Sequence, residues 1–141
     1  MKEKTFLDTN IFIYSIDTSP DEKNKSKRSQ QIVKEHIANE SGVISIQILQ
    51  EFYQVATRKI QKPISTKEAL EYLRYMSILE ILYPDFNMIV SAIHLHEKHL
   101  ISFWDGMILQ AAATAGCTVL LTEDLQDGFC LENLKVVNPF V

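Results

Sequence analysis

The feature of this sequence that most constrains its fold is the alternation of short apolar runs with longer amphipathic stretches. Apolar runs of a few residues predict buried strands, and apolar residues spaced every three or four positions predict helices. Strands that alternate with helices are typical of α/β proteins. We therefore expect a three-layer α/β/α sandwich with a mostly parallel central sheet of about five strands, formed by one domain over residues 1–141.

The expected elements have clear local end signals. Ser65 and Glu68 have the spacing of a capping box, and Asp85 and Ser102 are favoured N-caps. Gly42 and Gly116 are expected to end the helices that precede them. Strands are expected at residues 5–7, 43–44, 81–83, 118–121 and 136–137, and helices from residue 11, over 22–39, from 45 to about 59, from 65, over 86–99 and from 102 to about 115.

Composition limits the possible functions. The net charge of −4 argues against a protein that coats a nucleic-acid duplex through phosphate neutralisation, and it is compatible with carboxylates gathered around divalent cations. Cys117 and Cys130 lack metal-like spacing, which favours reduced thiols in a cytoplasmic protein. We expect no membrane segment, because no apolar run is long enough for one.

Two acids follow expected strands. Asp8 comes directly after residues 5–7, and Asp124 lies in the turn after residues 118–121. Either could simply cap a helix or a turn, but ligands of open α/β sheets bind beyond the carboxyl ends of the strands. Glu123 and Asp127 stand close to Asp124, and spacing alone does not decide which of the three points inward.

Two further acids lie on expected helices. Glu51 falls at the border of an apolar stripe, where its carboxylate can face the core edge or solvent. Asp105 follows Ser102 by three residues, as in a variant of the capping box. Trp104 is expected to pack with Ile108 at i and i+4.

Carboxylates gathered at one edge of a sheet repel one another. Two charges about 4 Å apart cost about 4 kcal/mol at an effective dielectric near 20. Such a cluster needs a cation, and oxygen ligands suit Mg²⁺ or Mn²⁺.

The order of these residues resembles a known family, the PIN domain, and within it the VapC-type ribonuclease toxins. The resemblance lies in residues 6–10 (Phe-Leu-Asp-Thr-Asn), Glu51, residues 104–108 (Trp-Asp-Gly-Met-Ile) and residues 121–124 (Leu-Thr-Glu-Asp). Gly106 departs from the pattern, since Ala is common at this place, but the change removes no ligand.

The resemblance implies that Asp8, Glu51, Asp105 and Asp124 bind the metal and carry catalysis, and that Asn10 and Thr122 hold the site in shape. It further implies an endoribonuclease that uses Mg²⁺ or Mn²⁺ to hydrolyse RNA phosphodiester bonds. The implied partners are an RNA substrate, a cognate antitoxin of a type II toxin–antitoxin pair, and a second copy of the chain in a homodimer.

Two further groups of side chains lie outside the acids. Lys23, Lys25, Lys27 and Arg28 are either a solvated helix face or a source of phosphate contacts. A zinc site is disfavoured at residues 94–99, because only His96 and His99 can meet on a helix and no third ligand is in register.

Two alternative functions remain. A phosphatase of the haloacid-dehalogenase type also begins with Asp after the first strand, but it needs a second Asp where this chain has Asn10. A receiver-like domain or a catalytically inactive PIN-like module that binds RNA or protein would differ from a nuclease by failing to cut RNA in the presence of Mg²⁺.

Overall fold

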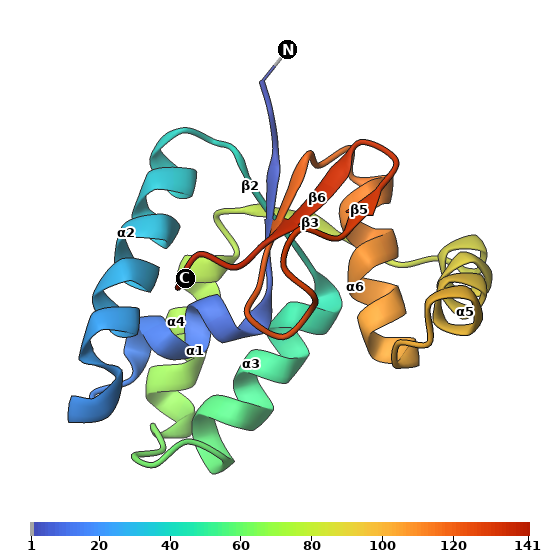
Figure 1. Cartoon of the computed structure of the whole chain (residues 1–141). Helices are drawn as coiled ribbons and strands as arrows, with labels where there is room; N and C mark the ends of the chain where they lie inside the picture. Colours follow the sequence, from blue (N-terminus) through green and yellow to red (C-terminus); the bar gives the residue numbers. More distant parts are fainter. Residues whose placement is uncertain (1) are drawn as a thin grey trace.

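A mostly parallel sheet forms the centre of the computed structural model, which describes residues 2–141 (Figure 1). The order of its six strands is β3-β2-β1-β4-β6-β5, and β5 alone runs antiparallel to its neighbour. The strands are β1 (Thr5–Leu7), β2 (Gly42–Ser45), β3 (Glu80–Leu82), β4 (Val119–Leu121), β5 (Cys130–Leu131) and β6 (Leu134–Val137). The three-layer α/β/α fold with a mostly parallel sheet is therefore confirmed.

Helices cover both faces of this sheet (Figure 1). The helices are α1 (Thr9–Ile16), α2 (Lys23–Ala38), α3 (Ile46–Arg58), α4 (Thr66–Met76), α5 (Phe86–His99) and α6 (Phe103–Thr114), with a short 3-10 helix, η1 (Pro20–Glu22), before α2. In Figure 1, α1 and α2 lie on one side of the sheet, and α6 lies on the other with α5 outside it. None of the helices that the structure describes combines the length and apolar character needed to cross a membrane.

The chain changes direction across the sheet between β1 and β4. From β1 it moves through β2 to β3, and it then returns to place β4 on the other side of β1. Two adjacent strands whose connections leave in opposite directions leave a crevice at their carboxyl ends, where ligands of α/β proteins bind. Asp8 and Thr122 directly follow these two strands.

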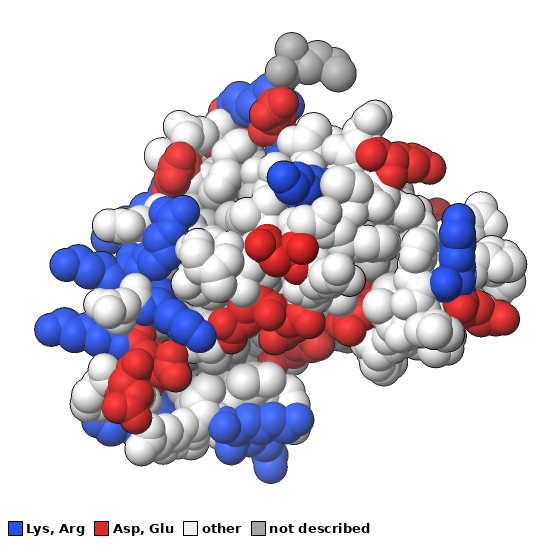
Figure 2. Space-filling model, viewed as in Figure 1, with Lys and Arg blue, Asp and Glu red and all other residues white. Residues whose placement is uncertain are grey.

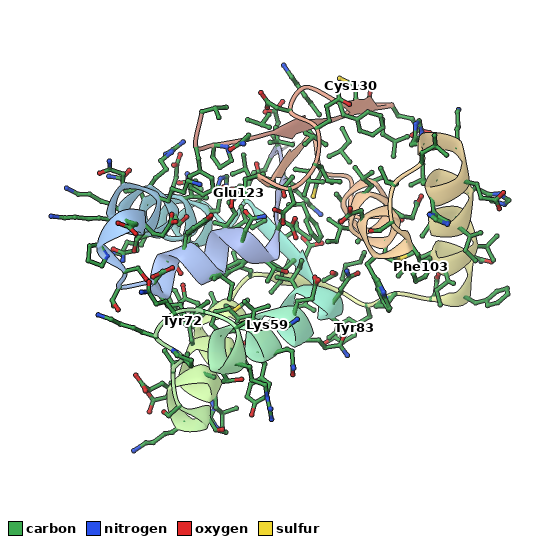
Figure 3. All side chains as sticks on the ribbon, turned by 60° about the horizontal axis from the view of Figure 1, so that its bottom comes forward. Lys59, Tyr72, Tyr83, Phe103, Glu123 and Cys130 are labelled. Atoms are coloured by element: carbon green, nitrogen blue, oxygen red, sulfur yellow. The ribbon has the colours of Figure 1, made fainter. Side chains whose placement is uncertain are left out.

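The core is built from the strands and the inward faces of the helices. Phe6 and Leu120 of the central strands are fully buried, as are Phe12 of α1 and Phe52 of α3. Tyr72 joins three helices, because its ring stacks on Phe52 with centroids 5.0 Å apart and its hydroxyl hydrogen-bonds Ser15 (Figure 3). This packing fixes α1 and α3, two helices that begin at the carboxyl edge of the sheet.

The end of α2 differs from the prediction. Glu40, with φ of 53°, takes the left-handed position that follows the helix, and Gly42 instead begins β2. Gly42 leaves room there for two neighbours: a Cβ atom at this position would lie 2.7 Å from Leu79 Cδ2 and 3.0 Å from His36 Cβ, so that these side chains would have to shift. The expectation that Gly42 ends the helix was therefore wrong.

Gly106 allows α6 to approach α5 closely. A Cβ atom on residue 106 would lie 2.7 Å from the backbone oxygen of Ala92 in α5. An alanine would therefore force the two helices apart. This close approach gives a physical reason for the departure from Ala at this position.

Candidate active site

Asp8 lies at the centre of the candidate site. Its side chain is 4% exposed, and its backbone N–H donates to the oxygen of Leu121, which ties it to the end of β4 (3.1 Å). The Oδ1 atom accepts from the backbone N–H of Thr9 at 2.7 Å and so caps α1. The Oδ2 atom accepts from the Thr122 hydroxyl at 2.7 Å.

Thr122 connects three polar residues of the site. Besides donating to Asp8, its buried Oγ1 accepts from Asn10 Nδ2 at 3.1 Å and from the backbone N–H of Asp124 at 3.0 Å. Asn10 Nδ2 also donates to Asp124 Oδ2 at 3.1 Å. The predicted supporting residues, Asn10 and Thr122, thus lie where they orient Asp8 and Asp124.

The three acids after β4 point in different directions. Asp124 faces Asn10 in the cluster, whereas Glu123 accepts hydrogen bonds from the Tyr14 hydroxyl and from Lys25 Nζ (2.9 Å for Lys25). Figure 3 shows Glu123 in the loop beside α1. Asp127 accepts from the backbone N–H of Asn138 at 2.8 Å. The structure therefore directs Asp124 toward the other acids and uses Glu123 and Asp127 elsewhere.

Glu51 and Asp105 approach the cluster from two helices, and the charge of Asp105 acts on Glu51. Glu51, half-buried on α3, accepts from the Thr9 hydroxyl at 3.1 Å and from Gln47 Nε2 at 3.4 Å. Asp105 lies in the first turn of α6, where its backbone N–H donates to Ser102 Oγ at 3.0 Å. The predicted cap by Ser102 is confirmed.

The pKa values show that the four acids act on one another. The pKa of Asp8 is raised to about 7, chiefly by burial and in smaller part by the charges of Glu51 and Asp124, while the hydrogen bonds from Thr122 and Thr9 oppose the rise. Burial also raises the pKa of Glu51, and Asp105 and Asp124 add to this effect. The pKa of Asp105 is raised by burial and then by Asp124.

The composition of this cluster fits a divalent cation. Carboxylate oxygens are the ligands that Mg²⁺ and Mn²⁺ prefer. In addition, the Oδ1 atom of Asn10 is buried and has no hydrogen-bond partner among the described residues. Among residues 2–141, no three His, Cys, Asp or Glu side chains by themselves form a group that could hold an ion, and Mg²⁺ commonly completes its shell with water.

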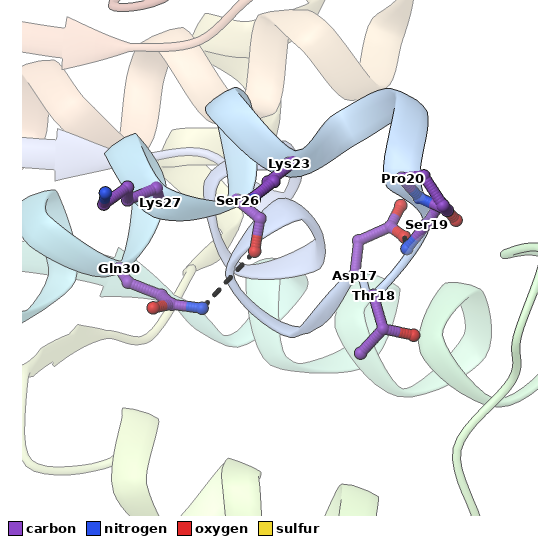
Figure 4. Close-up of a pocket in the computed structure, with 8 residues that line it drawn as sticks. All are labelled: Asp17, Thr18, Ser19, Pro20, Lys23, Ser26, Lys27 and Gln30. Carbon is purple, nitrogen blue, oxygen red and sulfur yellow. Dashed lines mark hydrogen bonds between the residues drawn. The ribbon is translucent and has the colours of Figure 1, made fainter.

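Figure 2 shows the distribution of charge around this cluster. Acidic side chains gather across the middle of this face, and Lys and Arg gather at the left, where α2 lies in Figure 1. Lys23 and Lys27 line a cleft between η1 and α2, where Gln30 Nε2 donates to Ser26 Oγ at 3.3 Å (Figure 4). Lys25 differs from its neighbours because its ammonium group pairs with Glu123.

Thr9 has a role that no sequence pattern predicted, and Trp104 lies differently from the prediction. Thr9 lies 42 positions before Glu51, so no local pattern predicted that its hydroxyl would hold this carboxylate. Trp104 is 62% exposed rather than packed into the helix interface, whereas Ile108 is buried as expected. Trp104 therefore stands open to solvent next to Asp105.

Comparison with known proteins decides the family. The PIN domain family matches residues 5–129, which include all four acids. The chain belongs to the PIN domain family. Nucleases with PIN domains generally use divalent metal ions. A search of curated proteins finds no match to this sequence.

Solved PIN domain structures of toxin–antitoxin systems have the same fold. The toxin–antitoxin complex from Klebsiella pneumoniae has a TM-score of 0.69 and 16% identity, and covers 96% of this chain and 98% of that one. DNA-bound VapBC from Salmonella typhimurium has a TM-score of 0.66 and 22% identity, with 95% and 96% covered. A VapC toxin of Mycobacterium tuberculosis that cleaves the sarcin–ricin loop has a TM-score of 0.62 and 13% identity, with 83% and 87% covered.

Proposed function

We propose that this PIN domain is an endoribonuclease that depends on Mg²⁺ or Mn²⁺ and is the toxin of a type II toxin–antitoxin pair. The observation that carries the proposal is the convergence of Asp8, Glu51, Asp105 and Asp124 at the carboxyl edge of β1 and β4, where burial and the charges of neighbouring acids raise the pKa values of Asp8, Glu51 and Asp105. Solved toxins with the same fold, one of them described as cleaving RNA, support this choice of substrate.

The proposed mechanism assigns a task to each part of the cluster. Asp8, Glu51, Asp105 and Asp124 would hold the cation, which when bound activates water and stabilises charge on the phosphate. Thr122 and Asn10 fix the directions of Asp8 and Asp124, and Thr9 fixes Glu51. One of these carboxylates would also accept the proton of the attacking water.

The decisive experiment is incubation of the purified protein with total RNA in Mg²⁺, Mn²⁺ or chelator, followed by mapping of the cut ends. We expect cleavage with metal, none with chelator, and loss of cleavage in Asp8→Asn and Asp105→Asn. Asp127→Asn is the matched control, because Asp127 bonds to Asn138 outside the cluster. Full activity in folded Asp8→Asn would refute the mechanism, and metal binding without cleavage by the wild type would favour a binding module.

The proposed partners follow from the same fold. The Klebsiella and Salmonella structures are toxin–antitoxin complexes, which supports an antitoxin partner for this chain. The homodimer is supported by α5, whose outer face exposes Phe86, Ile89, Val90 and Ile93. The cytoplasmic location and a single domain over residues 1–141 remain predictions. Cys117 and Cys130 are both free thiols in the structure.

A further inference from the structure

A shallow hollow of about 280 Å³ lies beside the acidic cluster, between α3 and the start of α6. It is lined by Gln47, Gln50, Glu51, Gln54 and Trp104. Glu51 belongs both to this hollow and to the acidic cluster, so the two are continuous. A ligand in the hollow would therefore lie next to whatever the acids hold.

Trp104 provides one wall of the hollow. Its side chain is 62% exposed, although its backbone is held by two neighbours: Gln47 Nε2 donates to its carbonyl oxygen at 3.3 Å, and Ser102 caps the helix that begins beside it. The ring of Phe103 meets it edge-on, with centroids 5.1 Å apart. An exposed aromatic face on a fixed backbone suits stacking of a flat ligand.

Glutamine side chains provide the other wall. Gln47, Gln50 and Gln54 follow one another at helical spacing along α3. Gln50 and Gln54 are exposed, and within residues 2–141 neither side-chain amide has a hydrogen-bond partner. Each amide offers both a donor and an acceptor, which can match the edge of a nucleobase.

The charge of the residues that line the hollow favours a nucleobase over a phosphate as its ligand. No Lys or Arg is among the residues that line it, and the carboxylate of Glu51 would repel a phosphate. A neutral planar group with a polar edge meets no such repulsion. The volume lies just below the range of roughly 300–1,000 Å³ for pockets that enclose a larger ligand, so it suits one base.

We infer that this hollow is a nucleobase-binding subsite in which Trp104 stacks on a base next to the scissile phosphodiester and Gln50 and Gln54 contact the edge of that base. The inference rests on the proposed ribonuclease function and adds to it a determinant of cleavage-site preference. Trp104 acts here as a substrate-binding residue and takes no part in the chemical step.

The first test uses fluorescence, because Trp104 is the sole tryptophan in the chain. Folded Asp8→Asn protein with Mg²⁺ is titrated with tetraribonucleotides of each base and with an abasic oligonucleotide of equal length. Stacking predicts saturable quenching by base-containing oligonucleotides and little change with the abasic one. Equal quenching by both, or no change with any base, would overturn the subsite.

The second test uses kinetics on an oligoribonucleotide that contains a mapped cut. Trp104→Ala is expected to raise KM roughly tenfold with a smaller effect on kcat, and Trp104→Phe to stay within about threefold of the wild type. Tyr83→Ala, which removes another exposed aromatic ring that does not line the hollow, is the control for nonspecific effects. Gln50→Ala and Gln54→Ala are expected to change the base preference at the mapped cuts.

The outcomes separate this subsite from other roles of Trp104. A fall in kcat with unchanged KM would mean that Trp104 only positions Asp105, and unchanged kinetics with weaker antitoxin binding would make the hollow a protein-docking surface. Either result overturns the proposal. If the wild type cuts no RNA with either metal, the proposed nuclease function is wrong. The fluorescence titration does not depend on cleavage, so it still tests base binding at Trp104.

Discussion

Asp8 divides its two carboxylate oxygens between two tasks. One oxygen caps α1 through Thr9, and the other accepts the Thr122 hydroxyl inside the cluster. A helix cap and a candidate metal ligand are therefore compatible in a single side chain. The arrangement has a cost, because the carboxylate is buried beside two other acids, which raises its pKa to about 7.

We predict that the burial of the Asp8 carboxylate beside other acids makes the metal-free protein less stable as the pH rises. Because the pKa of Asp8 is raised from 3.8 to about 7 on folding, the folded state binds more protons than the unfolded chain between these values. The free energy of unfolding therefore falls through this range, by at most about 4 kcal/mol from Asp8. Asp8→Asn is expected to flatten this dependence and to be the more stable protein at about pH 8.

Urea denaturation of the wild type and Asp8→Asn, in chelator at about pH 5 and about pH 8, measures this effect. Asp127→Asn controls for the loss of a carboxylate outside the cluster. If the free energies of unfolding of the wild type and Asp8→Asn changed with pH in parallel, the loss of stability would not come from Asp8.

At the scale of the elements, local signals predicted the helices better than the strands. The capping box of Ser65 and Glu68 and the caps at Asp85 and Ser102 appear as expected, because each involves residues three positions apart. The strand β5 was not predicted. It pairs with β6 across a two-residue turn whose first residue is Glu132, with φ of 54°, where Gly would have given a recognisable signal.

The candidate site was predictable to the extent that it follows strand ends. Asp8 and the group of three acids after β4 could be placed from the apolar runs before them, because the carboxyl ends of parallel strands meet at one edge. The direction of Glu51 and the choice among the three acids after β4 depend on contacts between distant residues, such as Thr9 with Glu51 and Lys25 with Glu123. Such contacts leave no periodic pattern in the sequence.

The helix α5 is apolar on two faces. Met88 and Ala92 are buried against the rest of the molecule, whereas Phe86, Ile89, Val90 and Ile93 form a stripe of exposed apolar residues. A helix that is apolar around its circumference is normally covered on both sides. We expect a second copy of the chain to cover the stripe, because one surface can pair with itself about a two-fold axis.

Ile93→Glu is therefore predicted to shift the protein from dimer to monomer. It places a charge in the apolar stripe, and burial of an unpaired charge is strongly unfavourable. Light scattering coupled to size-exclusion chromatography measures the mass, with His94→Glu as a control on a neighbouring face of the same helix. A dimer that survives Ile93→Glu, or a monomeric wild type, would contradict the assignment of α5 as the dimer interface.

At the scale of the whole molecule, the protein is acidic overall but exposes a group of basic side chains on α2. The net charge is −4, yet Lys23, Lys27 and Arg28 are exposed on α2, the helix at the left of Figure 1, where Lys and Arg gather in Figure 2. Lys25, in contrast, is already paired with Glu123. The exposed three can therefore contact RNA phosphates without first breaking an ion pair.

Replacing Lys23, Lys27 and Arg28 with Gln is predicted to weaken RNA binding and to reduce its salt dependence. Each lost phosphate contact lowers the slope of log K against log salt by about 0.7 for a single strand, so the slope should fall by roughly 2. Binding of RNA to Asp8→Asn protein over a range of NaCl concentrations measures the slope. Lys25→Gln should change it less, and an unchanged slope in the triple variant would place the RNA elsewhere.

The two outermost strands limit how molecules of this protein can join. At one margin β3 has three residues and Glu80 there pairs with Lys4, and at the other β5 has only two residues. Edge strands this short offer few unpaired backbone N–H and C=O groups to a neighbouring chain. Extension of the sheet by a second molecule is therefore unfavourable, and assembly must use side chains on the helices, where a single substitution can reverse it.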